Sequence, residues 1–125
     1  MGIKRGAKRV GTMPAKTPVS ERQKALYDRL LATHPAIERK GRNLLYTSVN
    51  GHMFTVFSTG AVLGIRLPAE ERERFLKRFE TSLLESYGVV MKEYVAVPDA
   101  LLESTARLAP YLAKSYDYVR SLPPK

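Results

Sequence analysis

Hydrophobic and polar residues alternate along the middle of the chain, between Asn43 and Phe79. This alternation predicts three short strands, because successive side chains of a strand point to opposite faces of its sheet. Asn50-Gly51 separates the first two strands, and both residues tolerate the positive φ that a two-residue hairpin turn needs. Ser58-Thr59-Gly60 forms the second turn. The predicted strands are Leu44–Val49, His52–Phe57 and Ala61–Arg66.

Both faces of this predicted meander contain apolar residues. With a three-residue second turn, the expected core face collects Leu44, Tyr46, Met53, Thr55, Phe57, Ala61, Leu63 and Ile65. The opposite face collects Leu45, Thr47, Val49, His52, Phe54, Val56, Val62 and Arg66. The second set is half apolar, more than a freely solvated face requires, which raises the question of what covers it. A one-residue slip in the pairing would exchange some of these assignments.

Helical spacing of apolar residues flanks the meander on both sides. Ser20 and Gln23 form a capping box that predicts a helix start, and His34-Pro35 stops this helix because a residue before proline avoids the α region. A second helix is expected to begin at Pro68, and Pro110 fits near the start of a terminal helix that ends before Pro123-Pro124. The three buried stripes are Leu26, Tyr27, Leu30 and Leu31; Phe75, Leu76, Phe79 and Leu83; and Leu108, Tyr111, Leu112, Ser115, Tyr116, Val119 and Leu122.

The remaining segments complete one α+β domain. Ala36–Arg42 is predicted to be a short polar edge strand, and Val89–Val97 the last strand. Asp99 can cap a short helical turn. Strands joined by short turns are antiparallel. We therefore predict a two-layer sandwich, with a mainly antiparallel sheet of four or five strands and helices on one face, in the order α-β-β-β-α-β-α.

Charge divides the chain more sharply than hydropathy does. Residues 1–18 contain no acid and five cations, Lys4, Arg5, Lys8, Arg9 and Lys16, so this segment holds +5 of the net +9. Its glycines, prolines and lack of apolar period predict a flexible basic extension ahead of a single domain over residues 19–125. Cysteine is absent, and no apolar run is long enough for a membrane span or a secretory signal. We expect a cytoplasmic protein without membrane contact.

No pattern of catalytic or metal-binding residues stands out. Glu70, Glu71 and Glu73 lie at a helix start among basic residues, which is typical of a solvated, dipole-compensating face. The two histidines, His34 and His52, are far apart, and without cysteine they give no metal-ligand spacing. His34 is expected to cap a helix end and His52 to lie exposed at a turn. The serines have no nucleophile-elbow context and no phosphate loop occurs. We predict no metal, no cofactor and no enzymatic site, with an unrecognised enzyme as a minor alternative.

The basic extension carries the clearest binding hypothesis. Lysine and arginine interleaved with glycine and proline can follow a phosphate backbone without reading sequence. Arg39, Lys40 and Arg42 would extend the surface if the segment folds near them. The alternative is an extension with only weak affinity for polyanions. Base-specific recognition would need an element such as a helix-turn-helix, which the sequence does not show.

Four strings carry a resemblance to a known family: VNGHMFTVF, GAVLGIRLP, YVAVPDALL and APYLAKSYDYVRSLPPK. In their order and spacing they resemble the N-terminal domain of the TfoX/Sxy competence regulators, over roughly residues 20–125. The YjbR/MmcQ-type proteins are the nearest alternative family, with a similar hairpin sequence. The resemblance implies an α+β fold, no established enzymatic activity or cofactor, and regulation of transcription or competence by protein contact. Full-length regulators carry a further C-terminal domain, and the basic extension is not part of their pattern.

Two functions follow as hypotheses. The first is a non-enzymatic regulatory or interaction module whose second sheet face, around Leu45, Val49, Phe54 and Val56, binds a partner protein, a second copy or the chain's own extension. The second is a nucleic-acid-associated protein that binds phosphates through its basic extension.

Overall fold

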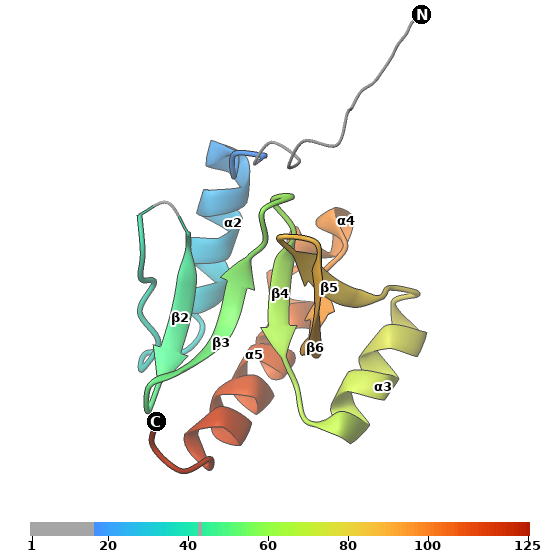
Figure 1. Ribbon diagram of the computed structural model, residues 1–125. Helices are drawn as coiled ribbons and strands as arrows, with labels where there is room; N and C mark the ends of the chain where they lie inside the picture. Colours follow the sequence, from blue (N-terminus) through green and yellow to red (C-terminus); the bar gives the residue numbers. More distant parts are fainter. Residues whose placement is uncertain (1–16, 43) are drawn as a thin grey trace, which may run out of the picture.

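The computed structural model describes residues 17–42 and 44–125. Five antiparallel strands form one sheet, and helices pack against it, so the predicted two-layer α+β sandwich is confirmed (Figure 1). The elements in chain order are α2 (Glu21–Leu31), β2 (Tyr46–Val49), β3 (His52–Phe57), β4 (Leu63–Arg66), α3 (Ala69–Arg78), β5 (Leu83–Ser86), β6 (Val89–Ala96), α4 (Asp99–Leu102) and α5 (Thr105–Arg120). Within the described ranges, no helix is long and apolar enough to cross a bilayer.

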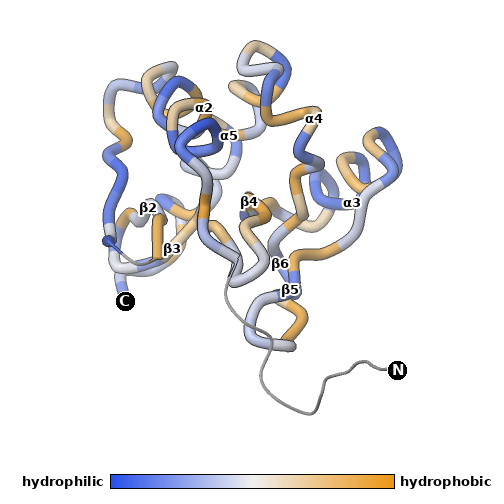
Figure 2. The backbone as a smooth tube through the Cα atoms, turned by 90° about the horizontal axis from the view of Figure 1, so that it is seen from above, coloured by the Kyte–Doolittle hydropathy of each residue, from blue (hydrophilic) through white to orange (hydrophobic). Residues whose placement is uncertain are grey.

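The strands lie in the order β2-β3-β4-β6-β5. The first three form the predicted meander, and β6 pairs with β4 on its other side. Figure 2 shows α2, α4 and α5 on one side of this sheet, while the β5–β6 connection projects on the other side. We call the side away from these helices the helix-free face.

The first hairpin forms as predicted. Asn50 and Gly51 have φ of 55° and 79°, the left-handed values that a two-residue turn with matching twist requires. The capping box of α2 also forms, because the Ser20 hydroxyl accepts from the Gln23 amide and the Gln23 side chain accepts from the Ser20 amide.

The predicted division of residues between the two faces was wrong in part, because β3 contains a β-bulge. Thr47 pairs with Thr55 and Ser48 with Met53, so Phe54 is an extra residue in β3. A bulge breaks the strict alternation of side chains and increases local twist. Phe54 and Leu45 therefore belong to the main core under the helices, whereas Met53 packs on the helix-free face.

The main core lies between the sheet and the helices. Tyr27 packs edge-on against Phe57 at 5.1 Å, and Phe75 packs in the same way against Tyr111 at 4.9 Å. Three buried hydroxyls form a chain within this layer, since those of Tyr27 and Thr47 lie 2.6 and 2.5 Å from that of Thr55. These two hydrogen bonds satisfy hydroxyl groups that would otherwise be buried without partners.

The helix after Pro68 is shorter than predicted. It ends at Arg78, and the amides of Glu80 and Thr81 bond back to the carbonyls of Lys77 and Leu76. This is a Schellman motif, in which Glu80 adopts the left-handed conformation with φ of 49°. Leu83, predicted to lie on the helix, instead begins β5.

β5 and β6 form a second hairpin that was not predicted. Leu83 was expected on the helix after Pro68, and Val89–Val97 was expected to be the last strand. Tyr87 and Gly88 make the turn of this hairpin with φ of 55° and 73°. The pairing jumps from Leu83 opposite Val95 to Leu84 opposite Met91. The irregularity lets the outer half of the hairpin leave the plane of the sheet, and Figure 1 shows β5 in front of β6.

Two further boundaries differ from prediction. Residues 36–42 do not form an edge strand, because only Lys40 makes an isolated bridge, to Tyr46. The terminal helix begins at Thr105, so Pro110 lies within it rather than at its start. Asp99 does not cap α4, because it is the first residue of that helix and Pro98 is the N-cap; its carboxylate binds Arg22.

Candidate functional site

A second, smaller apolar cluster covers the helix-free face. Val56, Leu84 and Tyr94 are buried at its centre, and Leu44, Tyr46, Met53, Met91 and Ala96 pack around them. Leu84 reaches this face because Gly64 lies opposite it, and a Cβ atom at Gly64 would collide with the Leu84 Cδ2 atom. The β5–β6 hairpin therefore supplies part of the cover that the apolar second face requires.

An open apolar groove remains beside this hairpin. It has a volume of about 310 Å³ and is lined by Leu44, Met53, Val56, Ser86, Tyr87, Val89 and Met91. No charged residue in the described part of the chain lines it, and the Ser86 hydroxyl accepts from the amide of Thr59. We call it the sheet groove. Its lining can contact an apolar side chain from another molecule but offers few hydrogen bonds.

The tip of the β5–β6 hairpin is an apolar projection next to the sheet groove. Val89 is 62% exposed, Tyr87 54% and Val90 47%. Among the described residues, one other large hydrophobic side chain is comparably exposed, that of Val62 in the β3–β4 turn. The tip is tied to that turn because the Thr59 hydroxyl accepts from the Tyr87 amide. An apolar projection and an apolar groove therefore lie side by side.

Tyr94 connects two strands on the helix-free face. Its hydroxyl donates to the carbonyl of Met53 at 2.7 Å and so links β6 to β3 across the sheet. Burial raises the pKa of Tyr94 to about 12, and the neighbouring Arg66 opposes this rise. The hydroxyl therefore keeps its proton at alkaline pH values where a free tyrosine ionises, and it serves as a structural donor.

The predicted partner-interface residues do not share one surface. Leu45 and Phe54 are buried in the main core, and Val49 packs against the same core. Val56 is buried on the helix-free face, where it lines the sheet groove. Of the four residues, Val56 lies on the helix-free face, whereas the bulge places the other three on the helix side.

The predicted nucleic-acid residues are only partly placed. Lys4, Arg5, Lys8, Arg9 and Lys16 lie outside the described residues. Arg39 is 3.3 Å from the Asp28 carboxylate, and Lys40 donates to the Ser48 hydroxyl at 2.9 Å. Arg42 is exposed, and Leu44, two positions on, lines a cavity of about 300 Å³ with Thr17 and Pro18. The structure thus brings the end of the 39–42 segment near the described start of the chain.

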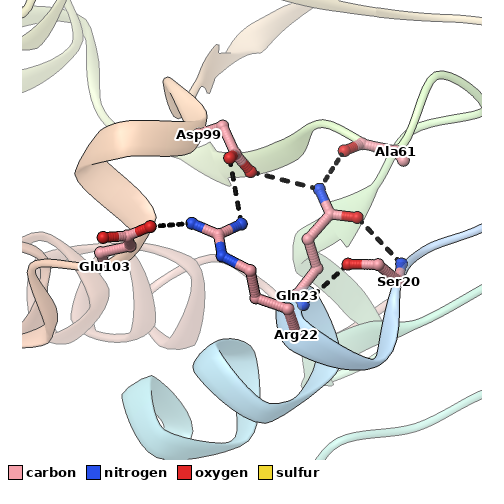
Figure 3. Close-up of polar contacts among 6 residues, drawn as sticks. All are labelled: Ser20, Arg22, Gln23, Ala61, Asp99 and Glu103. Carbon is pink, nitrogen blue, oxygen red and sulfur yellow. Dashed lines mark hydrogen bonds and ion pairs between the residues drawn. The ribbon is translucent and has the colours of Figure 1, made fainter.

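A polar cluster joins the start of α2 to two other elements (Figure 3). Arg22 lies between the carboxylates of Asp99 and Glu103, and Gln23 donates to the carbonyl of Ala61 at 2.8 Å. The hydrogen bond to Glu103 raises the pKa of Arg22 above its ordinary value. These polar groups are paired with one another, so the cluster links α2 to α4 and to the β3–β4 turn.

The two histidines serve as packing and turn contacts. The His34 ring lies 4.6 Å from the Tyr116 ring and is not at the end of α2 as a cap, since the helix ends at Leu31. His52 donates to the carbonyl of Pro123 at 2.7 Å. Across residues 17–42 and 44–125, no three His, Cys, Asp or Glu side chains are grouped to hold a metal ion.

The chain was compared with protein-family models, curated proteins and solved structures, and none of them matches it. The class of the protein is therefore defined by its fold, a two-layer α+β sandwich with one apolar face left partly open. Kinship with the TfoX/Sxy family stays a prediction from the sequence.

Proposed function

We propose that the protein is a non-enzymatic interaction module that works by self-association through its helix-free face. The observation that supports this proposal is the exposed apolar tip of the β5–β6 hairpin beside the sheet groove. In a twofold dimer the same patch of both copies meets, so a projection and a hollow placed side by side can fill each other reciprocally. The tip of one copy would enter the groove of the other.

The apolar lining of this face suits a second copy better than the rest of the surface does. The chain has a net charge of +9, so two copies repel over most of their surfaces. The described residues that line the sheet groove carry no charge, so close approach would not bury one of their charges. Removing Val89 and Val90 from water would contribute about 1.5 kcal/mol each. Regulation by protein contact, as the TfoX/Sxy resemblance implies, is a role that such a module would serve.

Light scattering over a concentration series tests the proposal on the full chain. We expect the mass to rise toward that of a dimer, and Val89→Glu to return it to that of a monomer because a carboxylate would be buried in the groove. Ala106→Glu is the matched control, since it adds the same charge at an exposed position of α5 and should leave dimerisation unchanged.

A chain that stays monomeric at every concentration would overturn the proposal. An equal effect of the two substitutions would also overturn it, because added charge alone would then explain the result. Val89 is largely exposed, so the V89E variant should keep the thermal unfolding midpoint of the wild type.

A further inference from the structure

A second hollow lies between α3 and α5, and its lining is basic. It has a volume of about 540 Å³ and is lined by Glu71, Arg74, Lys77, Arg78, Tyr111 and Lys114. Arg107 lies beside it, because its guanidinium and that of Arg78 each lie 5.1 Å from the centre of the Phe79 ring. We call this site, including Arg107, the α3–α5 groove.

The spacing of these residues explains why they meet. On α5, Arg107, Tyr111 and Lys114 are separated by four and three positions, which places them on one helix face. Glu71, Arg74 and Arg78 have the complementary spacing on α3. The two faces are joined by Lys114, whose ammonium lies 2.9 Å from a Glu71 carboxylate oxygen, and by Arg78, which donates to the Tyr111 hydroxyl at 3.1 Å.

Carboxylates neutralise only part of this charge. Glu70 pairs with Arg74 at 3.0 Å and Glu71 with Lys114. The nearby Glu73 and Glu80 form no ion pair with any described residue. Lys77, Arg78 and Arg107 have no carboxylate partner within the described part of the chain, so three cations of the groove are not held in an ion pair.

The groove also holds hydrogen-bond donors. The guanidinium groups of Arg78 and Arg107 both lie within cation–π distance of the Phe79 ring, and both side chains are exposed. The Tyr111 oxygen accepts from Arg78, which leaves its own proton for an acceptor, and no described residue takes that proton. The planar guanidinium group fits the oxygens of phosphate and carboxylate groups alike.

We propose that the α3–α5 groove binds the phosphate backbone of a nucleic acid. Arg107 and Lys114 are seven residues apart on α5, about 10 Å along the helix. That span exceeds a single phosphate group and suits successive phosphates of a polynucleotide. Binding of this kind positions the backbone without reading bases, and it does not depend on self-association through the sheet groove.

The described start of the chain, which follows the basic residues 4–16 in sequence, lies away from this site. Thr17, where the described chain starts, bonds to Thr59 in the turn before β4, whereas α3 follows β4. The two therefore lie at opposite ends of that strand, and they can be tested separately in the full chain.

The test is fluorescence anisotropy of a labelled 20-base-pair DNA duplex titrated with the full chain at several KCl concentrations. The groove variant carries Lys77→Gln, Arg78→Gln and Arg107→Gln. The control variant carries Lys92→Gln, Arg120→Gln and Lys125→Gln, which removes the same charge from exposed positions outside the groove. We expect the groove variant to bind at least tenfold more weakly, and its salt slope to fall by roughly 0.9 for each phosphate that the protein no longer neutralises. The control should change affinity less than threefold.

Equal losses of affinity in the two triple variants would overturn the proposal, because net charge alone would then govern binding. An unchanged groove variant would overturn it too, since residues outside the groove would account for all binding. Polyglutamate that competes as well as unlabelled duplex would show a general anion surface and also contradict it. If the loss of the Arg78–Tyr111 bond lowers the unfolding midpoint, the Lys77→Gln/Arg107→Gln double variant retains that bond and should still weaken binding several-fold.

Discussion

At the scale of single residues, Tyr94 links the stability of the fold to pH. Free tyrosine has a pKa near 10, whereas burial raises that of Tyr94 to about 12. Between these values the unfolded chain releases a proton that the folded chain keeps. The free energy of unfolding should therefore be unaffected by this group below pH 10 and should fall as the pH rises from 10 to 12.

We expect Tyr94→Phe to reduce this fall by up to about 2 kcal/mol across the window, because each raised pKa unit is equivalent to about 1.4 kcal/mol. Denaturant unfolding at pH 9, 10, 11 and 12 measures it. The variant should also lose about 1 kcal/mol at pH 7 through the missing bond to Met53. Burial raises the pKa of Tyr27 as well, and that contribution remains in both proteins. Parallel pH curves would show that Tyr94 does not titrate in this way.

Residue-level prediction from the sequence succeeded where chemistry is local and failed where it depends on pairing. The capping box at Ser20 and the turn at Asn50-Gly51 follow from the side chains themselves. The faces of Leu45 and Phe54 do not, because a single extra residue in β3 changes the alternation. A bulge arises from how two strands fit together, which the pattern of one strand does not contain.

At the scale of elements, one close contact packs β5 of the β5–β6 hairpin over the sheet. Leu84 is 1% exposed and lies against Gly64 of β4, where any side chain would collide with it. We expect Gly64→Ala to lower the free energy of unfolding by about 1–3 kcal/mol, since a packed core accommodates an added methyl group poorly.

A double-mutant cycle with Leu84→Ala tests the origin of that loss. The shortened side chain makes room for the methyl group, so Gly64→Ala should cost clearly less in the Leu84→Ala background than in the wild type. Additive losses would mean that the collision with Leu84 is not the cause.

The hairpin also shows why this element was misassigned from sequence. Leu83 continues the helical spacing of Phe75, Leu76 and Phe79, so periodicity extends the helix past its real end. Glu80 then adopts a conformation that glycine usually provides, and no glycine marks the stop. The signal that could have found the hairpin is Tyr87-Gly88 between two short apolar runs, a weaker form of the Asn50-Gly51 turn.

At the scale of the whole molecule, the two proposed surfaces should respond to salt in opposite directions. Self-association brings two chains of net charge +9 together, so screening should strengthen it. Binding to a phosphate backbone releases counterions, so added salt should weaken it. We expect the dimer fraction to rise and duplex affinity to fall over the same KCl series, measured by sedimentation and by anisotropy. A dimer that dissociates as salt increases would contradict an apolar interface.

The fold class could be predicted from the sequence because alternation, turns and helical stripes are each encoded in neighbouring residues. Neither candidate surface could be predicted from neighbouring residues, because each surface combines elements that are distant in the chain. The sheet groove joins Leu44 and Met53 to the β5–β6 hairpin, and the α3–α5 groove joins Arg78 to Tyr111. The spacing of Arg107, Tyr111 and Lys114 was a signal for the second surface, but only the packing of α5 against α3 shows what it faces.

Thr59 binds two backbone amides whose hydrogen exchange can be measured. Its carbonyl accepts from the amide of Thr17 at 2.8 Å, and its hydroxyl accepts from the amide of Tyr87 at 3.2 Å. Two amides far apart in the sequence are therefore shielded from deuterium by one residue of one turn. If this turn opens as a unit, both amides should exchange at a common rate, faster than those of β3 and β4. That rate would report how often the hairpin tip separates from the body of the domain.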